Sequence, residues 1–270
     1  MRALLLVALA PLVGCPHLPG TWADYDLPEE AAVVGMLFRG EGVGGYWSGD
    51  VFTTPVQLWW AWLHEPEDLH AWSRFAPGLG DCQIGEVTRD LVIAPGRADA
   101  TLRAEGLALE LADTGEGMLY FGTALSVSDY LHDATYELDL DIEGEEPLAF
   151  SPFIETPGAL SWTAPPVHGD APATLSSPEV TFEWEPVDAD MVLVEVSPYA
   201  GSTILESAYC LVTDTGAFDF PMGMLSTLPQ ADGLMLSVGA VTETARRIPD
   251  HEAGSRMTAL HLQVGLVFLP

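Results

Sequence analysis

The sequence predicts a mostly β protein made of two β-sandwich-like domains, with one short helix in the first. Residues 136–143 alternate strictly between apolar and acidic side chains, which is the period of a half-buried strand. Short apolar runs recur along the chain, separated by glycine-containing turn sequences, as at 113–115, 214–216 and 232–233. Prolines crowd between residues 152 and 178 and divide the chain in two, because proline resists central strands.

Besides residues 136–143, the apolar runs predict strands over 98–104, 107–112, 118–123, 180–184, 191–196, 234–241 and 257–268. The helix is expected to begin near Pro66, because proline fits a first helical turn and the acids Glu67 and Asp68 favour the positive end of the helix dipole. It ends at Pro77. The glycine-rich run 40–45 fits a hairpin loop, since the helix that a dinucleotide site requires does not follow it.

The chain begins with a short apolar run that follows Arg2 and closes with Leu12, Val13, Gly14 and Cys15. This run is too short to span a bilayer as a helix, and it resembles the lipobox of a bacterial lipoprotein. The resemblance implies that the chain is cut before Cys15 and that this cysteine then receives lipid, palmitate included. The alternative is an ordinary secretory signal in which the cysteine occurs by chance.

The resemblance implies a signal peptide over residues 1–14 and a lipid-anchored tether over 15–27. An N-terminal β domain is then expected over 28–156, a proline-rich linker over 157–178, and a second sandwich over 179–270. Residue 159 is an alternative start for the first strand of that sandwich. If the enteric sorting rule applies, Pro16 in place of an aspartate implies transport to the cell outer membrane.

The second half has a characteristic spacing of apolar anchors, at residues 160–162, 181–186, 192–196, 225–229 and 234–240. This spacing resembles a fibronectin type III or related immunoglobulin-like sandwich, with Leu234 near the place of the family's usual tyrosine. The resemblance implies an adhesion or spacer module without catalysis. The overall order also resembles that of surface lipoproteins of delta-type proteobacteria.

The chain is strongly acidic, with 40 Asp and Glu against 9 basic residues and a net charge of −31. Such a surface repels phosphate, so no nucleic-acid partner is expected. All of the basic residues are arginines, and the absence of lysine excludes Schiff-base chemistry. No cofactor is expected.

Two cysteines, Cys82 and Cys210, remain besides Cys15. In an exported protein they predict either a disulfide or two buried thiols, and the sequence leaves both open. The acids Asp139, Asp141 and Glu143 copy the first half of a calcium loop. The twelfth position of that loop is Phe150 instead of a glutamate, so these acids are expected to form a solvated strand face and no metal site.

The aromatic cluster of Trp59, Trp60, Trp62 and Trp72 is the main candidate for ligand binding, with Trp59 and Trp62 as candidate contacts. The same residues also fit a hydrophobic core. We therefore expect a lipid-anchored cell-envelope protein with a structural or binding role, no catalysis, and an envelope protein or a glycan as partner. One alternative is a carbohydrate- or cation-binding surface module. Another is an envelope hydrolase with an unrecognised site near His64 or His70.

Overall fold

A computed structural model describes residues 32–43, 56–63, 79–85, 98–111, 119–121, 126–142, 153–167, 173–175, 179–200, 203–247 and 254–269. The fold is mostly β, as predicted, with three sheets and one short α-helix in these residues. The predicted signal peptide, Cys15 with its expected lipid, and the helix expected near Pro66 lie outside the described residues. None of the helices in the described ranges has the length and apolar character needed to cross a membrane.

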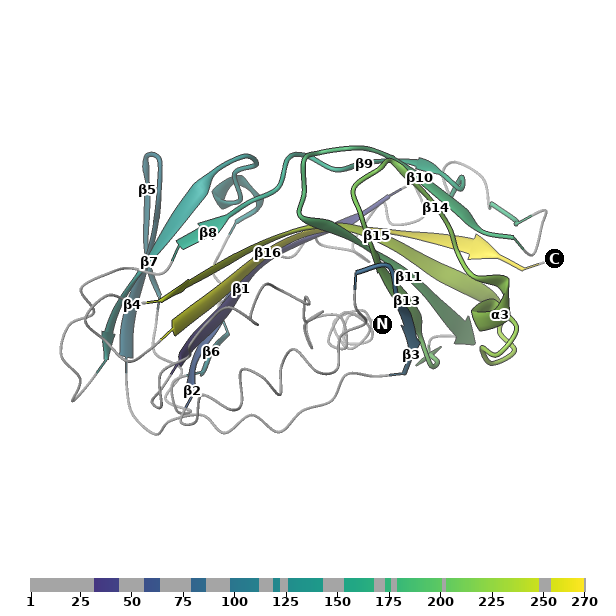
Figure 1. The fold of residues 1–270 in the computed structure, drawn as a ribbon, viewed down its shortest axis with the longest axis horizontal. Coiled ribbons are helices and arrows are strands. Elements are labelled where there is room, and N and C mark those ends of the chain that lie inside the picture. Colours follow the sequence, from purple (N-terminus) through teal and green to yellow (C-terminus); the bar gives the residue numbers. More distant parts are fainter. Residues whose placement is uncertain are drawn as a thin grey trace.

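The large sheet runs along the whole molecule and has the strand order β3-β13-β11-β15-β16-β1-β2-β6, with β12 paired to β11. Its strands are β1 (Ala32–Gly42), β2 (Val56–Leu63), β3 (Cys82–Ile84), β6 (Leu119–Phe121), β11 (Met191–Ala200), β12 (Thr203–Ile204), β13 (Ala208–Val212), β15 (Gly233–Arg247) and β16 (Gly254–Phe268). All neighbours are antiparallel except β1 and β16, which run parallel. Figure 1 shows this sheet curved into an arch, with the long β15–β16 hairpin along it.

The central strands of the large sheet are buried on both faces. All side chains from Met191 to Val196 in β11 are buried, and so are those from Leu234 to Val241 in β15. Near-continuous apolar runs are typical of strands that are covered on both sides, whereas half-exposed strands alternate. The long apolar runs of this sequence therefore form the middle of a layered structure.

A small sheet, β14-β10-β9, covers one face of the large sheet and forms a sandwich with it. Its strands are β9 (Ser161–Ala164), β10 (Thr181–Glu185) and β14 (Ala217–Asp219). Phe182 and Trp184 of β10 are buried, while Glu183 between them is exposed. The two aromatic side chains share a core with Val192 and Val194 of β11. The helix α3 (Met222–Leu225) follows β14 in the second half of the chain, and it is a different element from the helix expected near Pro66.

The third sheet has the order β5-β4-β7-β8, with β4 (Ala98–Ala104), β5 (Leu107–Leu111), β7 (Thr135–Ile142) and β8 (Phe153–Glu155). In β7, Tyr136 and Leu138 are fully buried while Glu137 is exposed, which confirms the predicted alternation. β8 lies against β15 and β16, and the Thr242 hydroxyl of β15 donates a hydrogen bond to the Glu155 carbonyl. The 3₁₀ turn η3 (Val127–Asp129) precedes β7.

The large sheet takes strands from both sides of the expected linker over 157–178. β1 pairs with β16 from Val33↔Ser255 to Gly42↔Val264, and β3 pairs with β13. This differs from the division into domains at 28–156 and 179–270, because β16 offers an edge that β1 covers. Gly40–Gly42, which the sequence placed in a hairpin loop, belong to β1. One continuous sheet therefore joins the two halves.

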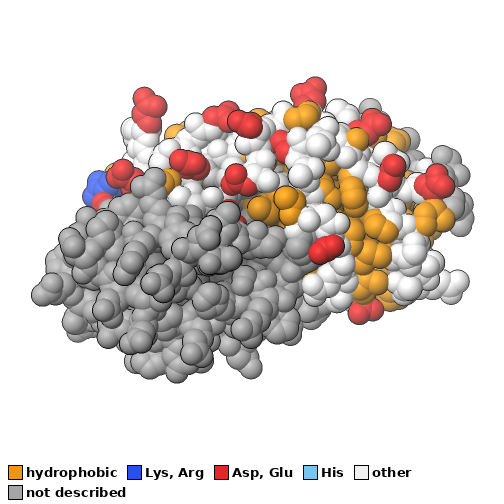
Figure 2. Space-filling model, in the orientation of Figure 1, with side chains coloured by type: hydrophobic (Ala, Val, Ile, Leu, Met, Phe, Trp, Pro, Cys, Tyr) orange, Lys and Arg blue, Asp and Glu red, His pale blue; other side chains and the backbone are white. Residues whose placement is uncertain are grey.

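Figure 2 shows Asp and Glu side chains spread over the visible described surface, whereas basic side chains are visible only at one end of it. The acidity of the composition is therefore expressed on this face. Charges dispersed in this way repel one another and are screened by salt within about 10 Å at 0.1 M ionic strength.

Candidate functional site

Five side chains with ionisable or aromatic groups meet where the three sheets approach one another. Arg39 and Glu41 lie on β1, His261 lies opposite Arg39 on β16, and Tyr130 and His132 lie between η3 and β7. We call these five residues the His261 cluster. Arg39 and Glu41 are two residues apart on a strand, so their side chains leave the same face of the large sheet.

His261 is 1 % exposed and both of its ring nitrogens are hydrogen-bonded. The Leu160 backbone N–H donates to Nδ1 over 3.2 Å. Because Nδ1 accepts, the proton of a neutral ring lies on Nε2, which donates to Glu41 Oε2 over 3.2 Å. This hydrogen bond is the main reason that the pKa of Glu41 is lowered, and Arg39 contributes to the same shift.

Both ring nitrogens of His132 are also hydrogen-bonded, one to Arg39 and one to the Pro157 carbonyl. The guanidinium of Arg39 has only donors, so Nη1 donates to His132 Nε2 over 2.9 Å. The ring proton then lies on Nδ1, which donates to the Pro157 carbonyl over 3.4 Å. Burial lowers the pKa of His132, and the nearby His261 and Arg39 lower it further. The geometry therefore favours a neutral His132.

The aromatic rings of the cluster pack against one another. The centroids of His132 and His261 are 4.8 Å apart, and the ring of Tyr130 lies 5.2 Å from that of His132. The guanidinium carbon of Arg39 lies 5.7 Å from the centre of the Tyr130 ring, within the range of a cation–π contact. Burial raises the pKa of Tyr130, whose hydroxyl makes no hydrogen bond to any of the described residues.

Gln263, two residues after His261 on β16, also hydrogen-bonds the backbone of residues 160–162 through its side chain. The Trp162 backbone N–H donates to Gln263 Oε1 over 2.9 Å, and Gln263 Nε2 donates to the Leu160 carbonyl over 3.1 Å. Side chains of β16 thus satisfy backbone groups of residues 160–162, which enter the small sheet. This segment is attached to β16 through side chains instead of a backbone ladder.

The cluster contains the residue types that acid–base catalysis uses, and each ring nitrogen of His132 and His261 is hydrogen-bonded to another residue of the chain. A general base needs a nitrogen or oxygen within reach of a substrate proton, and a nucleophile needs a hydroxyl or thiol hydrogen-bonded to a base. In the described ranges, no Ser, Thr or Cys side chain is hydrogen-bonded to His132 or His261. As arranged, the cluster braces β1, β16 and the segments at 130–132 and 157–160 against one another.

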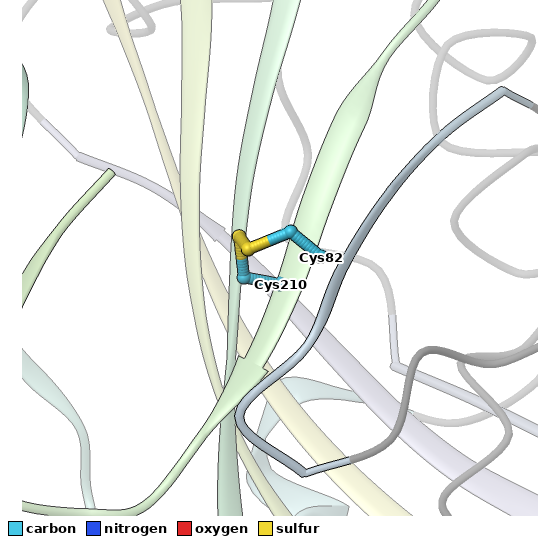
Figure 3. Close-up of a disulfide and its surroundings, with 2 residues drawn as sticks. All are labelled: Cys82 and Cys210. Carbon is cyan, nitrogen blue, oxygen red and sulfur yellow. A yellow bond between two sulfur atoms is a disulfide. The ribbon is translucent and has the colours of Figure 1, made fainter. Parts of the chain in front are cut away.

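Cys82 and Cys210 form a disulfide across β3 and β13, where they are directly opposed (Figure 3). Their Cα atoms are 4.1 Å apart, and 128 positions separate them in sequence. Cys210 is fully buried in the sandwich core. Of the two alternatives that the sequence left open, the structure has the disulfide.

The candidate calcium residues lie on the exposed face of β7. Asp139 Oδ2 accepts a hydrogen bond from Arg103 Nε over 2.6 Å, and Asp141 is opposite Asp99 on β4. Glu143 lies outside the described residues. Among the described residues, no three His, Cys, Asp or Glu side chains are placed to hold a metal ion together.

The candidate ligand-binding tryptophans are described only by their backbone positions. Trp59 and Trp62 lie in β2, opposite Met36 and Val33 of β1. Trp72, His64 and His70 lie outside the described residues. The structure brings together His132 and His261, which the sequence did not single out. Pairing of β1 with β16 puts Arg39 opposite His261, and Arg39 donates a hydrogen bond to His132, which lies in the segment between η3 and β7.

Comparison of the sequence with protein-family models and with curated proteins gave no match.

Proposed function

We propose that this chain is a lipid-anchored protein of the cell envelope, held at the outer membrane, whose β body has a structural or binding role. The disulfide between Cys82 and Cys210 carries the proposal. Disulfides persist in oxidising compartments outside the cytoplasm and are rare inside it. The lipobox that ends at Cys15 supports the same compartment independently.

An adhesion or spacer role is supported by the kind of body that the chain forms. Three strands, β14-β10-β9, pack on the four strands β13-β11-β15-β16, which is the layering of fibronectin type III-like modules. The His261 cluster adds support because both ring nitrogens of each histidine are occupied by protein atoms. The partner is an envelope protein or a glycan, and the membrane contact is made through the lipid.

The proposal is tested by a Cys15→Ser variant of the full chain expressed in a bacterium fed labelled palmitate. The wild-type chain should carry the label and sediment with the outer membrane. The variant should carry no label and remain an uncut, larger precursor, because no other residue can accept the lipid. Cys82→Ala is the matched control, since it removes a cysteine outside the lipobox and should keep the label. Label that persists in Cys15→Ser would contradict the proposal.

A further inference from the structure

A second polar group lies on the face of the large sheet that points away from the small sheet. Val194 and Val196 of β11 belong to the sandwich core, so Glu195 between them points to the opposite face. Tyr209 of β13 and Ser237 of β15 are directly opposite Glu195 in the sheet register. Glu195 is 4 % exposed, Tyr209 8 % and Ser237 0 %. We call Glu195, Tyr209 and Ser237 the Glu195 row.

Among the described residues, only Oε1 of the Glu195 carboxyl accepts a hydrogen bond of good geometry. Ser197 Oγ donates to Oε1 over 2.6 Å and is itself 2.8 Å from Ser207 Oγ. Within the described part of the chain, Glu195 Oε2, Tyr209 OH and Ser237 Oγ are buried and make no hydrogen bond of good geometry, although the Ser237 hydroxyl lies close enough to Glu195 to lower the pKa of its carboxyl. Buried polar atoms are nearly always paired, and an exception calls for an explanation such as a bound ion. Three exceptions here stand side by side on three adjacent strands.

The chemistry of these atoms restricts what can bind between them. All three are oxygens, and oxygen ligands suit hard cations. Among the described residues no Arg or His pairs with Glu195, and the titratable group that faces it is Tyr209. Burial raises the pKa of Tyr209 to about 12, so its hydroxyl stays neutral at ordinary pH. The row therefore supplies one negative charge at most.

We propose that the Glu195 row binds one alkali-metal cation, with the Glu195 carboxylate as its charged ligand and the hydroxyls of Tyr209 and Ser237 as neutral ligands. A monovalent cation and the Glu195 carboxylate together carry no net charge. A divalent cation would leave a net charge buried, which is costly. The proposal is independent of the lipid anchor and of the adhesion or spacer role.

The cation competes with a proton for the same carboxylate. Burial raises the pKa of Glu195 to about 7, although the hydroxyls of Ser197, Ser207 and Ser237 lie near enough to oppose the rise. Below this pH the carboxyl is neutral and has no charge to offer. Above it, an uncompensated carboxylate would be buried, and the cation compensates it. Cation binding therefore strengthens as the pH rises through 7.

The test compares thermal denaturation of the purified full chain in NaCl, KCl and choline chloride at equal ionic strength, at pH 8 and at pH 5. Screening of the −31 charge is common to the three salts, so it cancels from the comparison. At pH 8 the denaturation midpoint should be higher in NaCl or KCl than in choline chloride, and the difference should saturate with concentration. At pH 5 the difference should vanish. Identical midpoints in the three salts at pH 8 would overturn the proposal.

Two variants connect the effect to the row. Glu195→Gln keeps the size of the side chain but removes the charge, so the difference between alkali and choline salts should be lost at pH 8. Ser237→Ala removes one neutral ligand, so half of the rise in denaturation midpoint should require a several-fold higher concentration of alkali salt than in the wild type. This variant tests the proposal even if Glu195→Gln does not fold. Glu183→Gln, in an exposed position of β10, is the control and should behave as wild type. If Glu183→Gln lost the difference between alkali and choline salts as fully as Glu195→Gln, the cations would bind diffusely to the acidic surface, and the Glu195 row would not be the site.

Discussion

At the scale of residues, the His261 cluster depends on two histidines whose partners define which ring nitrogen accepts a hydrogen bond. Leu160 donates to His261, and Arg39 donates to His132, so each ring has a nitrogen that must stay unprotonated. Protonation of His132 would replace an acceptor by a donor and break the contact with Arg39. The contacts between β1, β16 and the segments that contain His132 and Leu160 therefore depend on these hydrogen bonds.

The pH dependence of His132 follows from its lowered pKa. The unfolded chain binds a proton more readily than the folded one, so this residue contributes stability that is lost as the pH falls below the unfolded value of 6.5. His132→Gln should cost about 1 kcal/mol at pH 7.5 through a weakened hydrogen bond to Arg39. It should also lose less stability than the wild type between pH 7.5 and pH 5. Urea denaturation at the two pH values measures both effects, and an unchanged acid loss in the variant would contradict this role.

The residues of the cluster could be predicted from the sequence only in part. Arg39 and Glu41, like His261 and Gln263, are polar residues two positions apart in apolar surroundings, which places each pair on one face of a strand. Nothing local shows that the two strands are neighbours. Pairing between β1 and β16 brings these four side chains together, and the fold adds Tyr130 and His132 of the cluster from the segment before β7.

At the scale of elements, strands with a clear period or clear turns were predictable from the sequence. The predicted strand at 98–104 has the bounds of β4, and that at 136–143 differs from β7 by one residue at each end. β11 and β15 are longer than expected, ending at Ala200 and Arg247. Their extensions contain Pro198 and polar residues, whose strand conformation comes from pairing with a neighbour instead of a sequence pattern.

The disulfide holds the short edge strand β3 on β13. A bridge that closes a loop of this length stabilises a fold by about 5 kcal/mol on the chain-entropy model, with strain and residual structure reducing the measured effect. The double variant Cys82→Ala, Cys210→Ala should therefore unfold at a clearly lower urea concentration than the oxidised wild type. Adding reductant should bring the wild type close to the variant and leave the variant unchanged. A variant as stable as the oxidised wild type would show that the bridge adds nothing.

At the scale of the whole molecule, the continuous sheet predicts how the chain responds to cutting. The segment 157–178 is rich in proline and was expected to separate two domains, yet β1 pairs with β16 and β3 with β13 across it. Proline density is a local signal about backbone conformation. It contains no information about which strands pair, so the sequence indicated a boundary where the sheet is shared.

A single cut between residues 157 and 178 should leave the two fragments associated. Limited proteolysis under reducing conditions, followed by size-exclusion chromatography, would show one species with the elution volume of the intact chain. Reduction is needed because the Cys82–Cys210 bridge would otherwise link the fragments covalently. Separate elution of a folded C-terminal fragment would instead support the two-domain division.

The parallel pairing of β1 with β16 also has a consequence for the order in which the chain can fold. Of the described strands, β1 is synthesised first and β16 last, so the first strand waits for its partner until nearly the whole chain is present. Contacts between such distant segments slow folding and leave strand edges exposed in the meantime. Chains shortened at the C-terminus, before β16, would therefore have β1 without its neighbour and would be prone to aggregate.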